Sequence, residues 1–354
     1  MSKHRRLKNF IPAPKQVVST VVPKINMVES LYDSIIEGNE YGSIVSVIPK
    51  PEIDLIDEII KGLKAVQFIR LRPCLAYIGN VIRSDDYSGI VTADDLPFAE
   101  MIKGVPKDTE SVDVFLATMG GSAHQVSRFV NFLRARFKEV DFLVPSFCMS
   151  AGTLFALSGD HIWMNPTACL GPIDPQVPTK DGRFVPAQAL LLLISQLQEQ
   201  GDEALKNKGA VPWTAVRIID SLDKKELGDA ITASTYSITM ATQFLIQYKF
   251  KNWQTRETSQ IPVTDQYRQT RAFEIASALA AHDRWKNHGH SISRDVLWNE
   301  IKLQIDHPSP DLEKAISKLW ALFFWVFDKT PIIKLIVSEN YRFARHSIIL
   351  EKKL

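Results

Sequence analysis

The residue best suited to chemistry in this sequence is Ser150, which stands between two apolar segments. The run Phe142–Val144 before it predicts a buried strand, and Ala151–Leu157 after it predicts a helix. A serine at the start of a helix lies beside unpaired backbone N–H groups, at the positive end of the helix dipole. Such a position favours chemistry that stabilises an alkoxide or an oxyanion. Because serine is also a preferred helix cap, this segment alone favours the structural interpretation.

A second candidate is the pair Gly120 and Gly121, which follows the apolar run Val112–Ala117 and precedes a predicted helix. Glycines at such a turn let the backbone approach a ligand closely and direct N–H groups at it, as in an oxyanion hole. A tight turn without a ligand is the alternative, and the pair taken alone favours it.

Apolar runs that alternate with helical patterns predict an α/β core of parallel strands with helical crossovers. The strands are expected at Cys74–Ile78, Val112–Ala117, Phe142–Val144 and His161–Met164, and the helices at Asp94–Lys103, Ser127–Phe137 and Ala151–Leu157. The carboxyl ends of parallel strands share one edge of the sheet, where ligands bind. We therefore expect the glycine pair and Ser150 to lie at the same edge. This co-location favours a catalytic role for Ser150 over the role of a helix cap alone.

The rest of the sequence is expected to flank this core, which spans residues 66–204. Residues 1–65 predict an N-terminal arm and helices, with little structure over 1–25. The pattern over 205–354 is mostly helical and predicts a helical C-terminal region added to the core. The flanking helices are expected at Val28–Ile36, Ile53–Val66, Pro186–Glu199, Trp213–Leu222, Lys225–Tyr248, Arg271–His282, Arg294–Leu303 and Asp311–Phe327.

The 354-residue chain has the composition of a globular protein, with 45% hydrophobic and 23% charged residues. Its net charge of +2 gives no indication of a nucleic-acid partner. Cys74, Cys148 and Cys169 fall in or beside apolar runs, which predicts reduced core residues and a cytoplasmic protein. The basic N-terminus is not followed by the apolar region of a signal peptide.

The most apolar late segment is Leu319–Phe327, which is nine residues long. A helix needs roughly 20 apolar residues to span a bilayer, so this segment predicts a buried or partner-facing helix. A peripheral membrane contact through its aromatic side chains stays open as an alternative.

Motifs for phosphate, metal and hydrolase sites are absent from the sequence, so we expect no cofactor and no metal. It contains no GxGxxG, GxxxxGK[ST], HExxH, CxxC or GxSxG pattern. The run HDRWKNHGH at residues 282–290 could supply a base or a metal pair, although a solvated helix end is the favoured interpretation. His124, three residues after Gly121, is expected at an exposed helix start.

Two motifs together indicate a known family. The turn TMGG at residues 118–121 is followed by MSAGTLFALSGDHIWMNPTACLGPIDPQ at residues 149–176. In type and order, they resemble those of serine peptidases of the Clp/crotonase fold, and most of all the serine dehydrogenase proteinase family, relatives of signal peptide peptidase A. The resemblance covers about residues 69–204, and it implies a Clp/crotonase-like core. Met119 departs from the family, which usually has proline there.

The resemblance implies a role for each matching residue. Ser150 would be the nucleophile, and the N–H groups of Gly120, Gly121 and Ala151 would form the oxyanion hole. The remaining matches would border the groove in which a peptide binds as an added strand. They are Met119, His124, Ile173, Asp174 and Gln176.

The proton acceptor is the part of the site that the resemblance leaves open. A serine nucleophile is weak without a neighbour that accepts its proton. Clp-type peptidases carry a histidine where this chain has 173–175, whereas signal peptide peptidase A and its relatives use a lysine further along the chain. Lys206 and Lys208 lie nearest to that place, and Lys180 is a further candidate. Solvated lysines without a catalytic role are the alternative.

The resemblance therefore implies a cytoplasmic serine peptidase that cleaves extended peptides or proteins through an acyl-enzyme, with no nucleotide or metal. It also implies a homo-oligomer, since trimers, hexamers and larger rings are common in this fold. Two alternatives stay open. One is a pseudo-peptidase that binds peptides or partner proteins without cleaving them, and the other is an acyl-CoA-binding crotonase-like protein. MSAGT and GPIDPQ favour the peptidase.

Overall fold

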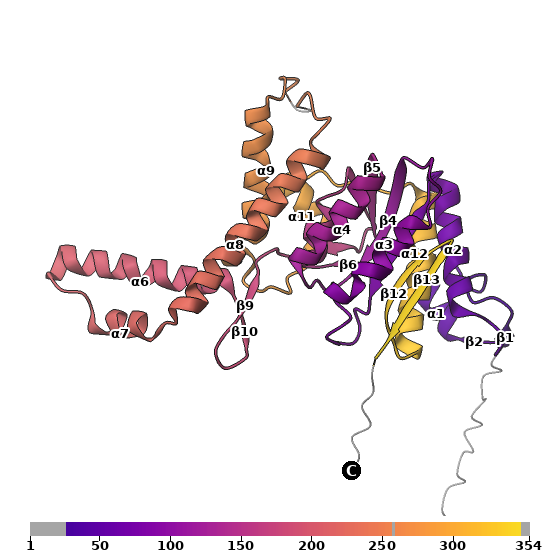
Figure 1. Cartoon of the computed structure of the whole chain (residues 1–354), viewed down its shortest axis with the longest axis horizontal. Coiled ribbons are helices and arrows are strands. Elements are labelled where there is room, and N and C mark those ends of the chain that lie inside the picture. The colour runs from indigo at the N-terminus through magenta and orange to yellow at the C-terminus, as the bar shows by residue number, and fades with distance from the viewer. Residues whose placement is uncertain (1–25, 257–258, 348–354) are drawn as a thin grey trace, which may run out of the picture.

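A six-stranded sheet forms the centre of the molecule, with strand order β13-β12-β3-β4-β5-β7. The computed structural model describes residues 26–256 and 259–347 (Figure 1). Strands β3, β4, β5 and β7 pair in parallel, whereas β12 is antiparallel to both β3 and β13. The strands are β3 (Cys74–Gly79), β4 (Ser111–Ala117), β5 (Glu139–Val144), β7 (His161–Met164), β12 (Ile332–Ser338) and β13 (Tyr341–His346).

The inner strands are apolar on both faces because helices cover both sides of the sheet (Figure 1). Every residue of β3 and of β12 is buried. One face packs against helices α2 (Leu55–Arg70) and α12 (Pro310–Lys329). The other packs against α3 (Asp95–Lys103), α4 (Ala123–Arg136) and α5 (Ala151–Ala156). The expected α/β class and the parallel strands with helical crossovers are confirmed.

A smaller sheet extends the structure beyond the carboxyl ends of the parallel strands. It has the order β11-β8-β6, with β6 (Phe147–Cys148), β8 (Cys169–Leu170) and β11 (Ile292–Ser293). Strand β6 leads directly to Ser150, and β11 brings the histidine-rich part of the chain beside β8. The segments on either side of the candidate site are therefore joined by backbone pairing.

A helical region projects from the sheet (Figure 1). It begins with the hairpin β9 (Gln176–Pro178) and β10 (Phe184–Pro186), and continues through α6 (Ala187–Lys208), α7 (Trp213–Ser221), α8 (Lys224–Phe244), the π-helical turn Leu245–Lys249 and α9 (Asp265–Ala280). The chain then returns to the sheet through α10 (His282–Trp285), α11 (Arg294–Val296) and a second π-helical turn, Leu297–Ile301. Before the core lie β1 (Asn26–Val28), α1 (Glu40–Val45) and β2 (Val47–Pro49), and the 3-10 turn Thr92–Asp94 precedes α3.

The structure differs from the sequence-based expectation at both ends of the chain. The helix expected at Val28–Ile36 was wrong: β1 ends at Val28 and turns follow, because Glu58 accepts hydrogen bonds from the Ser30 hydroxyl (2.6 Å) and the Tyr32 N–H (2.7 Å). Within the mostly helical region after residue 204, β12 and β13 join the central sheet. The expectation for residues 1–25 lies outside the described residues.

Two expectations about apolar residues hold in the structure. Cys74, Cys148 and Cys169 are free and buried, as predicted. The segment Leu319–Phe327 lies within α12, which packs against α2 and the sheet. In the part of the chain that the structure describes, no helix combines the length and apolar character required to cross a membrane.

Candidate active site

Ser150 lies between β6 and α5 in a backbone conformation that is rare for a residue with a side chain. Its φ is 51° and its ψ is −115°. The conformation is held from both sides, since the Met149 N–H donates to Thr118 O (2.9 Å) and the Leu154 N–H donates to Ser150 O (3.2 Å). A Cβ on Gly152 would stand 2.5 Å from the Thr118 side chain, so only glycine fits there. This pair of angles lies outside the left-handed helical region that non-glycine residues occasionally adopt, so it stores strain, and strain of this kind clusters at functional sites.

The glycine pair lies directly against this serine. Gly120 and Gly121 have φ values of 111° and 137°, in the region that only glycine adopts readily. A Cβ on Gly120 would stand 2.8 Å from the Ser150 Cβ and 3.3 Å from its Oγ. A Cβ on Gly121 would stand 2.3 Å from the carbonyl oxygen of Ile90. The structure thus brings the glycines and the serine together at the carboxyl edge of the sheet, as expected.

The three predicted oxyanion donors are not equivalent in this structure. The Gly120 N–H donates to the Thr118 hydroxyl (3.1 Å) and is already paired. The remaining predicted donors are the amides of Gly121, which is exposed, and of Ala151, the first residue of α5. Two amides close to the serine are enough to form an oxyanion hole.

The loop after β8 passes directly behind Ser150. A Cβ on Gly171 would stand 3.1 Å from the Ser150 nitrogen. The Thr153 hydroxyl accepts from the Gly171 N–H (3.0 Å) and lies 2.9 Å from the Cys148 carbonyl oxygen. Further along the loop, the Ile173 N–H donates to Leu279 O (3.0 Å) at the end of α9. These bonds fix the loop between the serine and the start of the histidine-rich segment.

Asp174, three residues beyond Gly171, binds two histidines. Its side chain is 1% exposed. His288 Nδ1 lies 2.8 Å from one carboxylate oxygen, and His282 Nδ1 lies 3.2 Å from the other. A hydrogen bond donated by Nδ1 leaves Nε2 of a neutral imidazole as the proton acceptor. A carboxylate that orients a histidine in this way is the usual support of a general base.

The sequence pointed to these histidines only weakly. The run at residues 282–290 is dense in histidines, but its polar composition favours a solvated helix end. The histidines are instead partly buried, with 18% of the His282 side chain and 23% of the His288 side chain exposed. Their common partner lies more than a hundred residues earlier in the chain, so their spacing could not reveal it.

The three candidate lysines lie in the projecting helical region. The Lys180 ammonium forms an ion pair with Asp223 at the start of α8, and 78% of the Lys180 side chain is exposed. Lys206 is exposed, and Lys208 is the last residue of α6. That helix points away from the sheet (Figure 1). Within one chain, the structure gathers the histidines rather than these lysines around the loop behind Ser150.

The residues expected along a substrate groove divide into exposed and buried groups. Met119 and Gln176 are exposed, and Gln176 lies in the β9–β10 hairpin. His124 is exposed and its ring lies 4.7 Å from that of Tyr236 on α8. Ile173 and Asp174 are buried, so they support the site from inside.

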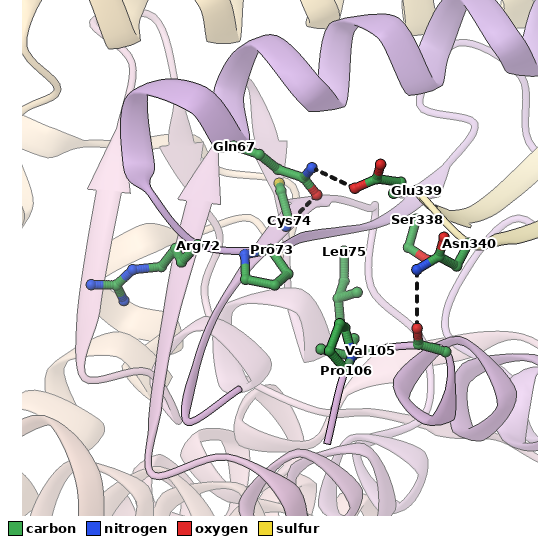
Figure 2. A pocket seen from close by; sticks show the side chains of 11 residues that line it. Gln67, Arg72, Pro73, Cys74, Leu75, Val105, Pro106, Ser338, Glu339 and Asn340 are labelled. Carbon is green, nitrogen blue, oxygen red and sulfur yellow. Dashed lines mark hydrogen bonds between the residues drawn. The ribbon is translucent and has the colours of Figure 1, made fainter. Parts of the chain in front are cut away.

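A separate hollow of about 160 Å³ lies at the opposite, amino-terminal edge of the sheet (Figure 2). Hydrogen bonds already occupy polar groups that line it. Gln67 accepts from the Cys74 N–H (3.0 Å) and donates to Glu339 (3.2 Å), and Asn340 donates to Gly104 O (3.2 Å). This hollow therefore offers little unpaired polar chemistry. Among the residues described, no three histidine, cysteine or acidic side chains form a group that could hold a metal ion.

Comparison with known proteins supports the family resemblance that the motifs indicate. Residues 74–206 match the model of the ClpP-like SDH-type serine proteinase family, which confirms the family indicated by the sequence motifs. Two proteins of Methanocaldococcus jannaschii are also similar. The uncharacterized protein MJ0137 is 34% identical over 110 residues, which is 31% of this chain and 36% of that protein. The uncharacterized protein MJ1495 is 27% identical over 145 residues, which is 41% of this chain and 47% of that protein. The chain thus spans less than half of either relative.

A solved structure is also similar to this chain. It is a lysine-to-alanine mutant of the 1510-N membrane-bound stomatin-specific protease, in complex with a substrate peptide. The match covers 68% of this chain and 94% of that one, with 15% sequence identity and a TM-score of 0.26. At this TM-score, the similarity supports no inference about substrate or location.

Proposed function

We propose that this chain, which carries a ClpP-like SDH-type serine proteinase domain at residues 74–206, is a serine peptidase that cleaves extended peptides through an acyl-enzyme on Ser150. The single observation that carries the proposal is the placement of Ser150. Its strained backbone and the contact with Gly120 set the hydroxyl beside the glycine turn and the start of α5, where the Gly121 and Ala151 amides lie. A nucleophile next to backbone N–H donors is the arrangement that acyl transfer requires.

The proposed base is one of the two histidines held by Asp174. Nε2 of the histidine takes the Ser150 proton as Oγ attacks the carbonyl carbon of the scissile peptide bond. The amides of Gly121 and Ala151 stabilise the oxyanion that forms. The histidinium then protonates the leaving amine as the C–N bond breaks. Water next attacks the acyl carbon and gives a proton to the same Nε2, which returns it to Ser150 Oγ as the acyl C–O bond breaks. The buried carboxylate of Asp174 supports this assignment over a lysine, because it fixes the tautomer of its partners.

The proposed substrate is an extended segment of a peptide or protein, bound by backbone hydrogen bonds. Gly121 pairs with Ile90 in a parallel bridge, and both Gly121 and Met119 are exposed at this edge. A peptide added along the turn would place its scissile carbonyl between Ser150 and the amides.

We also propose that the peptidase is a homo-oligomer of the cytoplasm. Support for the oligomer comes from large apolar side chains that are exposed on the projecting helices: Leu205, Trp213, Val216, Ile218, Ile219 and Ile231. Where exposed apolar side chains gather into a patch, another protein chain usually covers them. Light scattering of the purified protein measures the oligomer, and a mass equal to one chain at micromolar concentration would contradict it.

A fluorophosphonate probe tests the peptidase, because it reacts with serines that have an active base and oxyanion hole. We expect the wild-type protein to be labelled at Ser150, and Ser150→Ala to remain unlabelled and to lose cleavage of a mixed peptide library. A folded, assembled wild-type protein that shows no labelling dependent on Ser150 would instead support the pseudo-peptidase. Binding of an acyl-CoA to that unlabelled protein would support the crotonase-like alternative.

His282→Gln and His288→Gln identify the base. We expect one of them to lower the labelling rate by roughly 10³-fold or more, and the other to lower it by less, because only one ring hands the proton on. Lys180→Met serves as the control for the lysine alternative and is expected to be labelled at the wild-type rate. A larger loss in Lys180→Met than in both histidine variants would return the base to the lysines.

A further inference from the structure

A buried ionic cluster binds the segment that pairs with the glycine turn. Peptide cleavage as proposed above makes no use of this cluster. Its centre is Lys334 of β12, whose side chain is 0% exposed. The ammonium donates to the Asp94 carboxylate (2.5 Å) and to the carbonyl oxygen of Gly89. Burial of the ammonium is the main cause that lowers the Lys334 pKa to about 8. A buried charge of this kind is costly unless its partners are well placed.

Asp94 connects this lysine to the segment Gly89–Val91. The carboxylate oxygen that binds Lys334 also accepts from the Tyr77 hydroxyl (2.7 Å) and from the Val91 N–H (3.1 Å). Lys334 therefore holds the carbonyl at the start of the segment, and Asp94 holds the N–H at its end. The segment has little freedom to move relative to the sheet.

The middle of the same segment pairs with the glycine turn. The Ile90 N–H donates to Gly120 O (2.7 Å), and the Ser122 N–H donates to Ile90 O (2.8 Å). A Cβ on Gly89 would stand 2.7 Å from Gly120 O, which shows how closely the two backbones approach. Any shift of Gly89–Val91 is therefore passed to the turn that contacts Ser150.

We propose that Lys334 and Asp94 are positioning residues, which hold Gly89–Val91 so that the glycine turn presents the Gly121 N–H to the oxyanion formed at Ser150. The proposal rests on the proposed peptidase function. It gives a role in the active site to a residue of β12, outside the family-matched residues 74–206. An apolar side chain would fill this place at a lower cost of desolvation, so the contribution of the ammonium is the orientation that it imposes on the Gly89 carbonyl.

Lys334→Met tests the proposal, with Arg345→Met as the matched control. The methionine keeps the length of the side chain but cannot hold the Gly89 carbonyl. Asp94 keeps Arg345, which lies 3.2 Å from its second carboxylate oxygen, so the carboxylate stays paired. In the control, Asp94 loses that arginine while the bond from Lys334 to Gly89 remains. Both variants remove one cation from the same carboxylate.

The kinetics of labelling by the fluorophosphonate probe distinguish positioning from general stability. We expect Lys334→Met to lower the maximal rate of labelling roughly 10- to 100-fold, in the range for a misplaced oxyanion donor, with the half-saturating probe concentration changed less than about threefold. Arg345→Met is expected to keep both values within about twofold of the wild type. Equal maximal rates in the two variants would overturn the proposal, as would a loss in Lys334→Met that appears only in the half-saturating concentration.

Hydrogen–deuterium exchange gives a second readout that does not depend on catalysis. We expect the amides of Ile90 and Ser122 to exchange at least about tenfold faster in Lys334→Met than in Arg345→Met. Unchanged exchange overturns the proposal even if the wild-type protein is an active peptidase. If the wild-type protein is not labelled at all, the peptidase function fails, and the exchange rates alone decide whether Lys334 positions the turn. Should Lys334→Met not fold, Lys334→Gln is measured against the same control, with the same two criteria.

Discussion

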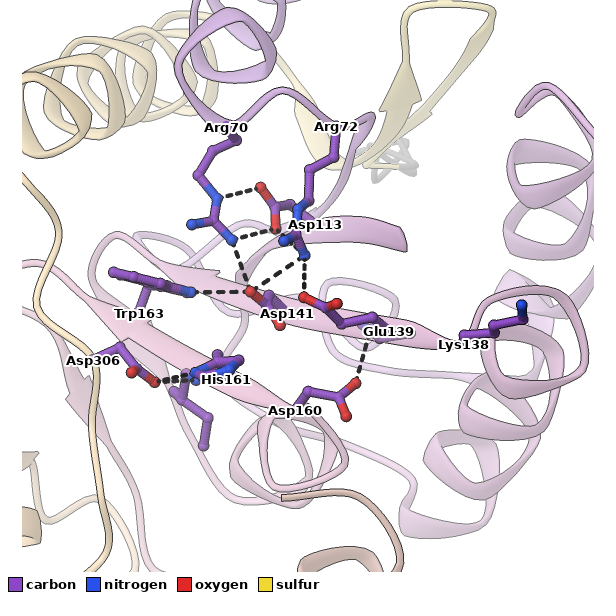
Figure 3. Close-up of polar contacts among 12 residues, drawn as sticks. Arg70, Arg72, Asp113, Lys138, Glu139, Asp141, Asp160, His161, Trp163 and Asp306 are labelled. Atoms are coloured by element: carbon purple, nitrogen blue, oxygen red, sulfur yellow. Dashed lines mark hydrogen bonds and ion pairs between the residues drawn. The ribbon is translucent and has the colours of Figure 1, made fainter. Parts of the chain in front are cut away.

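The two edges of the central sheet each hold buried aspartates, but their partners differ. At the amino-terminal edge, Asp141 binds Arg70 (2.7 Å) and the Trp163 indole N–H (3.2 Å), and Arg70 also binds Asp113 (Figure 3). At the carboxyl edge, Asp174 binds His282 and His288. Arginine stays protonated in proteins, whereas histidine exchanges its proton near neutral pH. The arginines of the first arrangement stay charged and hold the fold together, whereas the histidines of the second can take part in proton transfer.

The backbone conformations at the two edges also differ. Gly120, Gly121 and Ser150 meet at the carboxyl edge with positive φ values. At the amino-terminal edge, the positive φ of Leu71 belongs to an ordinary helix end, the left-handed residue that follows α2. Strain next to a nucleophile costs stability and favours chemistry. The proposed peptidase chemistry therefore lies at the carboxyl edge, whereas the arginine cluster at the other edge stabilises the fold.

Asp174→Asn gives the largest expected effect on this comparison. The amide cannot stabilise a histidinium and can hold one histidine in the wrong tautomer, so the rate of fluorophosphonate labelling should fall by roughly 10³-fold or more. The urea midpoint should change little, because an amide still fills the site and can form hydrogen bonds. Labelling at the wild-type rate would show that the Asp174 cluster is structural, like the arginine cluster.

Asp141→Ala should have the opposite outcome. The change leaves Arg70 and Arg72, whose side chains are 11% and 19% exposed, with one carboxylate partner fewer at a buried site. We expect the free energy of unfolding to fall by about 3 kcal/mol, and the labelling rate of the folded protein to stay within about twofold of the wild type. The comparison of the edges fails if labelling is lost while the unfolding curve is unchanged.

Ser150→Gly separates strain from chemistry at the carboxyl edge. Glycine adopts a φ of 51° without a Cβ clash, so this variant should be about 1 kcal/mol more stable than Ser150→Ala, which keeps the strained backbone. Neither variant should be labelled. Urea unfolding of the two proteins measures the difference, and equal midpoints would mean that the positive φ carries no strain.

The smallest effect is a pH dependence at the amino-terminal edge. A hydrogen bond to Asp306 raises the pKa of His161 above its usual value. The folded state therefore binds the proton more tightly than the unfolded one, and the pair contributes stability below a pKa of about 6.5 that is lost as pH rises through the higher folded-state pKa. The His161 side chain is 49% exposed, so the contribution is less than about 1 kcal/mol. Between pH 6 and pH 8, the wild type should lose more stability than His161→Gln in urea titrations, and parallel losses would contradict this.

The sequence was sufficient to predict the parts of the fold with regular apolar patterns. The strands at Cys74–Ile78 and Val112–Ala117 are confirmed almost to the residue, because runs buried on both faces are apolar throughout. Strand β12 was not predicted, although Ile332–Val337 is almost wholly apolar. Lys334 interrupts that run, and only its burial against Asp94 explains why a lysine stands there.

The sequence predicted the candidate site only where its residues follow successive strands of the same sheet. The glycine turn and Ser150 follow successive parallel strands, so the rule for sheet edges was enough to bring them together. The histidines that bind Asp174 lie more than a hundred residues later in the chain, after most of the helical region. Their approach depends on the bond between Ile173 and Leu279 and on the pairing of β11 with β8, which no local pattern encodes.

The pairing of β12 with β3 has a consequence for how this protein can be divided and how it folds. A fragment limited to the family-matched residues 74–206 would lack β12 and leave β3 as an open edge strand, with unpaired backbone groups along an apolar surface. Such edges recruit other chains and aggregate. Gly79 of β3 pairs with Lys334 of β12 although most of the chain lies between them, and pairings so distant in sequence slow folding. The unit built on the central sheet is therefore discontinuous in sequence, with the helical region inserted between its two parts.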